Sequence, residues 1–312
     1  MKYSVIVPVY NEEKNVIPLA KEILSVMSFL KSSYEIIFID DGSTDLTYNN
    51  LIQLQKKNPK KISIIQFRIN FGKAAAYDVG FKRSIGDIVI TLDGDGQDDP
   101  KEFPKLIKKL DEGFDMVSGW KITRKDSFIK NISSGLFNFV VNYIFKIKLH
   151  DINCGLKVYR KDAVKALDLY GRLHRYIPVL LTSQGYKVSE LPINHRKRLS
   201  GRSKYGAIRF INGFLDLFTV FSITKFRSRP MHVFGYVGIF FFIFGFIGCL
   251  LLTYDRVVLG LKIGDRPLLL LSIMLIIVGI QIGISGLVGE YIIKVSSSNI
   301  TTYNIKQIND HQ

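Results

Sequence analysis

The chain has 312 residues, and its 43 lysines and arginines against 27 aspartates and glutamates give a formal net charge of +16. Hydrophobic residues make up 47% and charged residues 22%, so the composition excludes a disordered chain and a collagen-like repeat. The two cysteines, Cys154 and Cys249, are too few for a disulfide scaffold, and we expect a reducing compartment. A chain of this length is enough for about two domains.

Residues 1–205 alternate strand-like and helix-like segments. Runs of β-branched and apolar residues predict strands, and helical spacing of apolar residues predicts the helices between them. In chain order we expect a strand at 3–9, a helix at about 12–30, a strand at 34–39, a helix at about 45–57, a strand at 62–67, a helix at about 73–84 and a strand at 87–92. Apolar strands joined by helices indicate an α/β domain with a mostly parallel central sheet.

Acidic and polar residues gather where three of these strands end. They are Asn11 and Glu12 after the first strand, Asp40 and Asp41 after the second, and Asp93 and Asp95 after the fourth. Ligands of parallel sheets bind beyond the carboxyl ends of the strands, so we expect these residues to face one crevice. A D-x-D sequence alone is a weak signal, because acidic turns are common in loops. Together, however, these hard oxygen ligands suit Mg²⁺ or Mn²⁺ that also binds phosphate.

Two uncharged apolar runs, 233–254 and 267–289, follow this domain. A helix rises ~1.5 Å per residue, so each run is long enough to cross the hydrocarbon layer of roughly 30 Å. We expect two transmembrane helices within 233–290 and a cytoplasmic tail at 291–312. The alternative is a pair of core helices in a soluble protein. The segment 206–232 is apolar with basic ends, and we expect amphipathic interfacial helices there or, alternatively, a helix packed on the preceding domain.

The basic residues that flank the two runs indicate how the hairpin is oriented. They are Lys225, Arg227 and Arg229 before the first run, Arg256, Lys262 and Arg266 in the connection, and Lys294 after the second run. The balance slightly favours a cytoplasmic N-terminal domain, with both termini cytoplasmic, in the cell (inner) membrane. The first residues reach acidic positions too early for a full signal-peptide core, so we expect no signal peptide.

Four motifs, SVIVPVYNEE, IDDGSTD, NFGKAAA and LDGDGQDDP, in this order and spacing, resemble glycosyltransferase family 2. The later segments HDINCGLKVYRKDAV and HRKRLSGRSKYG, followed by two spans, are similar to the polyprenyl-phosphate glycosyltransferases related to dolichol-phosphate mannose synthase and bactoprenol glucosyltransferase. The resemblance implies a GT-A fold and inverting transfer of a hexose from a nucleotide sugar to polyprenyl (undecaprenyl) phosphate. It favours UDP-glucose as donor, with GDP-mannose as the alternative.

The resemblance also implies roles for individual residues. The donor-binding residues would be Pro8, Tyr10, Asn11, Glu12, Asp40, Lys73, Asp93 and Gln97. Asp95 would hold the Mg²⁺ or Mn²⁺, with Asp93 beside it, and Asp151 of the D-x-x-C/S-G motif would orient or deprotonate the acceptor. Alternatively, Asn11 and Asp40 cap helices and Asp151 is structural.

Two basic segments would bring positive charge to these anionic substrates. In the first, 194–209, the residues implied in contact with the donor diphosphate are Arg198, Ser203 and Lys204. In the second, 121–130, Lys121 and Arg124 would bind the acceptor phosphate, although relatives carry Gly-x-Arg where this chain has Gly119-Trp120-Lys121. Alternatively, this second segment binds anionic lipid.

Two rival functions are distinguishable from the sequence. A processive polysaccharide synthase carries a Q-x-x-R-W motif, whereas the single tryptophan here, Trp120, lies in no such motif. A non-catalytic membrane protein that binds or transports nucleotide sugar or lipid would not require Asp93, Asp95, Asp151 and Lys204 to be intact. We expect no nucleic-acid partner. Glycines in both spans permit close helix contact and a homo-oligomer.

Overall fold

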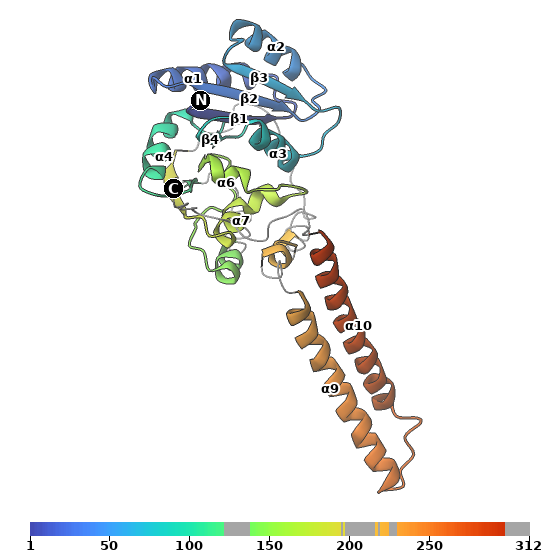
Figure 1. Ribbon diagram of the computed structural model, residues 1–312. Helices are drawn as coiled ribbons and strands as arrows, with labels where there is room; N and C mark the ends of the chain where they lie inside the picture. The colour runs from blue at the N-terminus through green and yellow to red at the C-terminus, as the bar shows by residue number, and fades with distance from the viewer. Residues whose placement is uncertain (122–137, 195, 197–215, 218, 225–229, 297–312) are drawn as a thin grey trace. The chain divides into compact units, whose positions relative to one another are not determined.

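The computed structural model describes residues 1–121, 138–194, 196, 216–217, 219–224 and 230–296 (Figure 1). The chain forms two compact units, 1–220 and 221–312. Several residues that the sequence singles out lie outside the described ranges: Arg124, Arg198, Ser203 and Lys204. Most of the expected interfacial segment 206–232 and most of the tail 291–312 lie outside them as well.

The first unit is built on a seven-stranded sheet. Its strands are β1 (Tyr3–Val9), β2 (Tyr34–Asp40), β3 (Ile62–Gln66), β4 (Ile88–Thr91), β5 (Met116–Lys121), β6 (Lys157–Arg160) and β7 (Val188–Ile193), in the spatial order β3-β2-β1-β4-β6-β5-β7. The strand β6 is antiparallel to its neighbours β4 and β5, and the other four pairings are parallel. The predicted α/β domain with a mostly parallel sheet is therefore confirmed.

Helices connect these strands, as the apolar periodicity predicts. They are α1 (Val16–Phe29), α2 (Thr47–Lys57), α3 (Lys73–Arg83), α4 (Phe103–Leu110), α6 (Lys161–Lys165) and α7 (Ile177–Ser183), with the short 3-10 helices η1 (Pro100–Glu102) and η2 (Leu173–Tyr176) and a helical segment at 138–145. The first predicted helix begins later than expected, at Val16, because residues 10–15 form the loop that follows β1.

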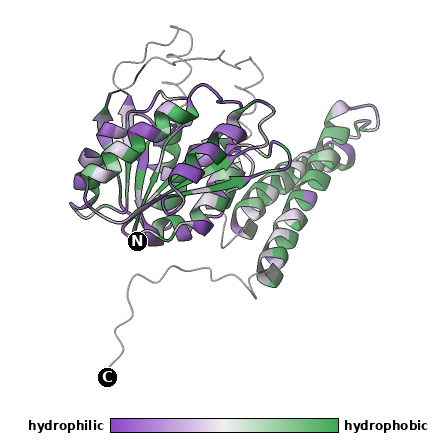
Figure 2. Cartoon of the chain, turned by 90° about the horizontal axis from the view of Figure 1, so that it is seen from above, coloured by the Kyte–Doolittle hydropathy of each residue, from purple (hydrophilic) through white to green (hydrophobic). Residues whose placement is uncertain are grey.

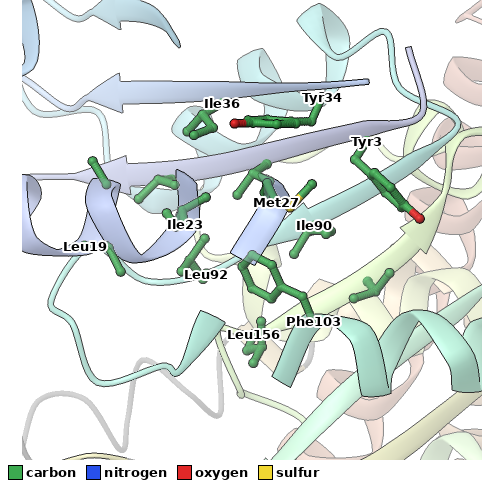
Figure 3. Close-up of a cluster of buried hydrophobic side chains, with 14 of the residues drawn as sticks. Tyr3, Leu19, Ile23, Met27, Tyr34, Ile36, Ile90, Leu92, Phe103 and Leu156 are labelled. Carbon is green, nitrogen blue, oxygen red and sulfur yellow. The ribbon is translucent and has the colours of Figure 1, made fainter. Parts of the chain in front are cut away.

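The alternation of side chains along β1 explains how helices cover both faces of the sheet. Val5, Val7 and Val9 belong to a buried cluster that includes Ile23 of α1 and Phe103 of α4 (Figure 3). On the opposite face, Ile6 lies against Gly80 of α3, where an added Cβ would be 2.6 Å from the Ile6 Cγ2. Burial of each such side chain contributes roughly 1.5–3 kcal/mol to folding.

The parallel register brings the polar loops to one edge of the sheet. Val9 is opposite Asp40 where β1 and β2 end, and Thr91, the last residue of β4, is opposite Ile6 of β1. The loops that follow these three strands therefore leave the sheet on the same side. This edge is the place where α/β proteins bind ligands.

The second unit contains a hairpin of two long helices, α9 (Pro230–Val257) and α10 (Pro267–Ser296). Their segments 231–257 and 267–292 are long and apolar enough to cross a membrane, and only 22% and 11% of their apolar windows are buried. Core helices of a soluble protein would be mostly buried, so these values favour the transmembrane hairpin. Figure 2 shows the hydrophobic character of both helices.

Small residues bring the two helices of the hairpin into close contact. A Cβ added at Gly279 would lie 2.6 Å from the Gly238 carbonyl oxygen, and one added at Gly245 would lie 2.6 Å from the Ser272 carbonyl oxygen. Ser272 and Gly279 are seven residues apart, as are Gly238 and Gly245, a spacing typical of helices that cross at a small left-handed angle. These glycines are therefore engaged inside the hairpin, and oligomerisation stays a prediction.

Candidate active site

The loops after β1 and β2 are joined by hydrogen bonds. The Asn11 Oδ1 accepts from the Thr44 amide at 2.8 Å, and the Asn11 amide donates to the Ser43 Oγ at 2.9 Å. Asp40 is fully buried, and its Oδ1 accepts from the Ser43 amide at 3.0 Å. The residues at the N-cap positions of α1 and α2 are Asn15 and Leu46. Asn11 and Asp40 therefore brace the two loops and do not cap these helices.

Asp41 holds the loop that leads into α3. Its Oδ1 accepts from the Phe71 amide at 2.8 Å, and its Oδ2 accepts from the Gly72 amide at 3.0 Å. Burial raises the pKa of Asp41, and these two amides oppose the increase. The adjacent Gly42 has φ +72°, and a Cβ there would be 2.6 Å from the Ile69 carbonyl carbon, so only glycine fits. These contacts fix the position of the next residue, Lys73.

Lys73 forms an ion pair with Asp93, the first acid of the Asp93-Gly94-Asp95 motif. The Tyr77 hydroxyl, one turn along α3, lies 3.4 Å from the same Asp93 Oδ1. Burial alone would raise the pKa of Asp93, but the cations around it, Lys73 first and then Lys121 and Lys157, lower it well below its usual range. Asp93 is therefore a carboxylate at neutral pH, and its side chain remains 27% exposed at the site.

The loop after β4 contains a second, fully buried acid, Asp98. Its Oδ2 accepts from the Asp93 amide at 3.2 Å, and its Oδ1 lies 3.4 Å from the Lys121 Nζ. Burial would lower the pKa of Lys121, but Asp98 and then other acidic groups raise it, so Lys121 stays charged. Asp95 is 9% exposed, and its Oδ1 accepts from the Gln97 amide at 3.1 Å. The carboxylates of Asp95 and Asp98 are therefore held by amides of the loop itself.

The D-x-x-C-G motif, residues 151–155, lies just before β6 and borders the site. The buried Asp151 accepts from the Asn153 amide at 3.2 Å through its Oδ1. The Lys157 Nζ, on β6, donates to the Cys154 carbonyl, and burial lowers the pKa of Lys157. Gly155 packs directly on Asp93, because an added Cβ would be 2.5 Å from the Asp93 Cγ. The motif therefore contributes two things to the site: Gly155, which packs against the Asp93 carboxylate, and Asp151 itself.

His150, the residue before Asp151, is clamped between two side chains. Its ring stacks on Trp120 with centroids 4.0 Å apart and planes 15° from parallel. Its Nδ1 pairs with Glu190 of β7, and its amide donates to the Glu190 Oε2 at 2.7 Å. Trp120 is the penultimate residue of β5, so three segments distant in the sequence hold the backbone at Asp151.

The basic segment 194–209 begins at the D-x-D loop. The Arg196 amide donates to the Gln97 carbonyl at 3.0 Å, and the Arg196 guanidinium pairs with Asp99 at 2.6 Å and with Glu22 at 2.7 Å. Arg196 therefore ties the start of this segment to the residues beside Asp95.

The structure brings together most of the described residues that the sequence predicts for the site. Lys73, Asp93, Lys121 and Asp151 lie in one electrostatic network at the carboxyl edge of the sheet, and Asp95 joins it through its interaction with Asp98. Pro8, Tyr10, Asn11, Glu12 and Asp40 lie at the same edge, at or just after the ends of β1 and β2, and the Pro8 carbonyl oxygen would be 2.9 Å from a Cβ at Gly94.

The sequence reasoning missed three residues of this network: Tyr77, Asp98 and Lys157. Tyr77 lies one turn after Lys73 on the same face of α3, so helical spacing could have indicated it. Asp98 belongs to the LDGDGQDDP motif, but the sequence reasoning assigned it no separate role, and Lys157 carries no signal, because charged residues are usually exposed and these two are buried through their contacts with other segments.

The D-x-D acids offer carboxylate oxygens, the kind of ligand that a divalent cation binds. Among the residues that the structure describes, no three His, Cys, Asp or Glu side chains form a cage for a metal ion. Mg²⁺ is usually bound by one or two carboxylates together with substrate phosphates, which is the kind of oxygen that Asp93 and Asp95 supply.

Known proteins resemble this chain over all or most of its length. Glycosyl transferase family 2 matches residues 4–168. The dodecaprenyl-phosphate galacturonate synthase of Rhizobium johnstonii is 33% identical over 318 positions, covering 100% of this chain and 94% of that protein. The undecaprenyl-phosphate 4-deoxy-4-formamido-L-arabinose transferase of Edwardsiella ictaluri is 32% identical, covering 93% of this chain and 88% of that protein.

Solved structures share the fold of the first unit. Glucosyl-3-phosphoglycerate synthase from Mycobacterium tuberculosis, in complex with Mn²⁺, uridine diphosphate and phosphoglyceric acid, superposes with a TM-score of 0.56 at 18% identity, covering 70% of this chain and 78% of that chain. The complex of the same enzyme with Mn²⁺, UDP-glucose and phosphoglyceric acid gives 0.54 at 17% identity, covering 71% and 80%. The predicted GT-A fold is confirmed, and the chain belongs to glycosyl transferase family 2 and is a glycosyltransferase.

Proposed function

We propose that this protein transfers a hexose from a nucleotide sugar to polyprenyl phosphate at the cytoplasmic face of the membrane. The observation that carries the proposal is the network of Lys73, Asp93, Asp95, Lys121 and Asp151 at the carboxyl edge of the sheet. Two relatives, whose names describe sugar transfer involving dodecaprenyl or undecaprenyl phosphate, support a polyprenyl-phosphate acceptor.

The donor would lie across the loops after β1, β2 and β4. Pro8, Tyr10, Asn11, Glu12 and Asp40 would contact the base and ribose, and Lys73, Asp93 and Gln97 the rest of the donor. Asp95, with Asp93 beside it, would hold Mg²⁺ or Mn²⁺, which supplies charge stabilisation to a bound diphosphate. Arg198, Ser203 and Lys204 would bind the same diphosphate from the segment that Arg196 anchors beside Gln97.

The acceptor would enter beside Asp151. Its phosphate is anionic at neutral pH, so its oxygen can attack the anomeric carbon with little help from a base, in one inverting displacement. Lys121, which Asp98 keeps charged, and Arg124 would bind this phosphate. Asp151, held by the clamp at His150, would orient the acceptor or remove its remaining proton. Electrostatic stabilisation of the departing diphosphate would supply most of the rate enhancement.

The sugar is a finer proposal. We favour UDP-glucose, and GDP-mannose is the alternative. The two relatives carry galacturonate and 4-deoxy-4-formamido-L-arabinose in their names, so the pocket of this chain can differ in the few contacts that distinguish sugars. The donor test therefore includes UDP-galacturonate beside UDP-glucose and GDP-mannose.

The deciding experiment supplies detergent-purified protein with undecaprenyl phosphate, Mg²⁺ or Mn²⁺ and each labelled donor in turn. We expect label to appear in the lipid fraction from one donor, and not with Asp95→Asn. Asp87→Asn is the matched control, because Asp87 is an exposed acid directly before the opposite end of β4. Binding of a nucleotide sugar without transfer from any donor would contradict the proposal and favour the non-catalytic function.

We also propose that both termini lie in the cytoplasm, in the cell (inner) membrane. The two helices form a hairpin, so one crossing each way places their outer ends on the same side of the membrane. Single cysteines at Lys262, in the connection, and at Lys31, in the first unit, should react differently with an impermeant maleimide in intact cells. Labelling of the Lys31→Cys variant, but not of Lys262→Cys, would contradict the proposed orientation and show the opposite one.

A further inference from the structure

Gln281 lies well inside α10, on the face that points away from α9. On the inner face, Ser272, Gly279 and Gly286 are buried against the other helix. Gln281 follows Gly279 by two residues, which rotates it about 200° around a helix of 3.6 residues per turn. Its side chain is accordingly exposed, in contrast to the buried residues of the hairpin contact.

The position of Gln281 places it deep in the hydrocarbon layer. The uncharged part of α10 runs from Pro267 to Gly289. With a rise of ~1.5 Å per residue, Gln281 is about 12 Å from the Gly289 end and about 21 Å from the Pro267 end. The side chain is too short to reach either boundary, so lipid headgroups and water cannot satisfy it.

The carboxamide of Gln281 requires hydrogen-bond partners. It carries two N–H donors and an oxygen that accepts. Within the described part of the hairpin, the hydrogen bond recorded at this residue joins the Ser285 Oγ to the Gln281 backbone carbonyl at 2.8 Å and leaves the carboxamide out. Lipid chains offer no partner, and polar groups inside membranes usually face protein.

We propose that α10 pairs with α10 of a second copy of this chain, with the two Gln281 carboxamides hydrogen-bonded to each other. A two-fold axis places the same residue opposite itself, and a carboxamide is self-complementary because it donates and accepts. The apolar residues Ile277, Ile284 and Val288 are on the same outward face and would pack beside the pair. This inference requires the hairpin to lie in the membrane, and it does not depend on the sugar or the acceptor.

Cysteine cross-linking in native membranes tests the face that pairs. In a full-length Cys249→Ser background, where the buried Cys154 is the remaining native cysteine, one cysteine at a time replaces Gln281, Ile277 or Val288 on the proposed face, and Ile280 or Leu287 on a neighbouring face as matched controls. All five positions are in α10, and the two controls are exposed like Gln281. We expect disulfide-linked dimers at the first three positions at least several-fold above the two controls. Equal cross-linking on both faces, or none at position 281, would overturn the proposal.

Substitution of Gln281 tests the role of the carboxamide itself. Gln281→Leu keeps the side chain close to its original size and suits a membrane helix, so the hairpin should still insert and the protein should resist alkaline extraction. Its dimer dissociation constant in lipid vesicles, measured by energy transfer between labelled copies, should rise about 3- to 30-fold. Ile280→Leu, the matched control, should leave it unchanged. An unchanged dissociation constant for Gln281→Leu, or loss of energy transfer in wild type when a different membrane protein is added in excess, would refute self-pairing.

Discussion

A methyl group added at Gly155 would collide with the carboxylate of Asp93. An alanine Cβ there would lie 2.5 Å from the Asp93 Cγ and 2.7 Å from the Oδ2, whereas ordinary contacts begin at 3.4 Å. The Oδ1 would be nearer still, so the carboxylate must move by about 1 Å, away from Gly155. A misplacement of about 1 Å in a reacting group can cost about 10²-fold in rate. We expect Gly155→Ala to lower kcat/KM for sugar transfer by about that factor.

The matched control is Gly80→Ala, which produces a similar overlap in an apolar part of the first unit. An added Cβ at Gly80 would lie 2.6 Å from the Ile6 Cγ2 and 3.2 Å from the Ile39 Cδ1. Overpacking of this kind destabilises by typically 1–3 kcal/mol, about 1 kcal/mol of which the higher helix propensity of alanine would offset. Gly80→Ala should therefore lower the melting temperature while the folded fraction keeps its activity.

The assay compares initial rates of both variants with wild type, at saturating lipid, over a range of donor concentrations. Rates are normalised to the folded fraction from a thermal melt followed by near-UV circular dichroism. If folded Gly155→Ala transfers sugar within about threefold of the wild-type rate, the contact between Gly155 and Asp93 does not position a group that the reaction needs. An equal loss of activity in Gly80→Ala would assign the effect to general loosening of the first unit.

Three further predictions address stability. Lys165→Met should destabilise the first unit by about 1–3 kcal/mol, measured by urea unfolding. The reason is that the Lys165 Nζ donates to three carbonyls at the end of α3, at 2.5, 2.9 and 3.1 Å. Lys161→Met, which loses one 3.3 Å contact, is the control. Burial and then Lys73 lower the pKa of His174 well below 6.5. The imidazole therefore takes up a proton more readily in the unfolded chain than in the folded one, and the free energy of unfolding falls as the pH drops below 6.5. His174→Gln should remove up to about 1.4 kcal/mol of that loss per pH unit. If the free energy of unfolding falls equally for wild type and His174→Gln between about pH 6.5 and 5.5, the argument is wrong. Gly279→Ala should separate the hairpin helices and lower its thermal stability in detergent, whereas Gly283→Ala, whose Cβ meets nothing, should not.

Local sequence pattern was sufficient for the first four strands. Each is a short apolar run, and the helices between them have clear helical spacing, so their positions agree with the structure to within a few residues. The placement of β6 was not accessible in this way. It has four residues, and its antiparallel position between β4 and β5 depends on pairing between segments distant in the sequence.

The same distinction applies to the site. Asp93 and Asp95 were predictable because they follow a buried strand directly. Lys157 was not, since a lysine in a strand normally indicates an exposed face. It is 3% exposed because neighbouring segments surround it and the Cys154 carbonyl accepts from its Nζ. The clamp of His150 by Glu190 likewise joins residues 40 positions apart, and no local pattern encodes that contact.

The charges at the site are already paired before any substrate is present. Lys73 is paired with Asp93, and Lys121 lies beside the buried Asp98. In our proposal, both lysines also face incoming anions: the donor for Lys73 and the acceptor phosphate for Lys121. Binding then exchanges the partners of lysines that are already charged and held in the site, so the desolvation penalty is mainly that of the incoming anions. The buried Asp98 has a further consequence, because it keeps Lys121 protonated in a site where burial alone would lower its pKa. A neutral amine at that position could not attract a lipid phosphate, so an acid that touches no substrate would set the charge that recognises one.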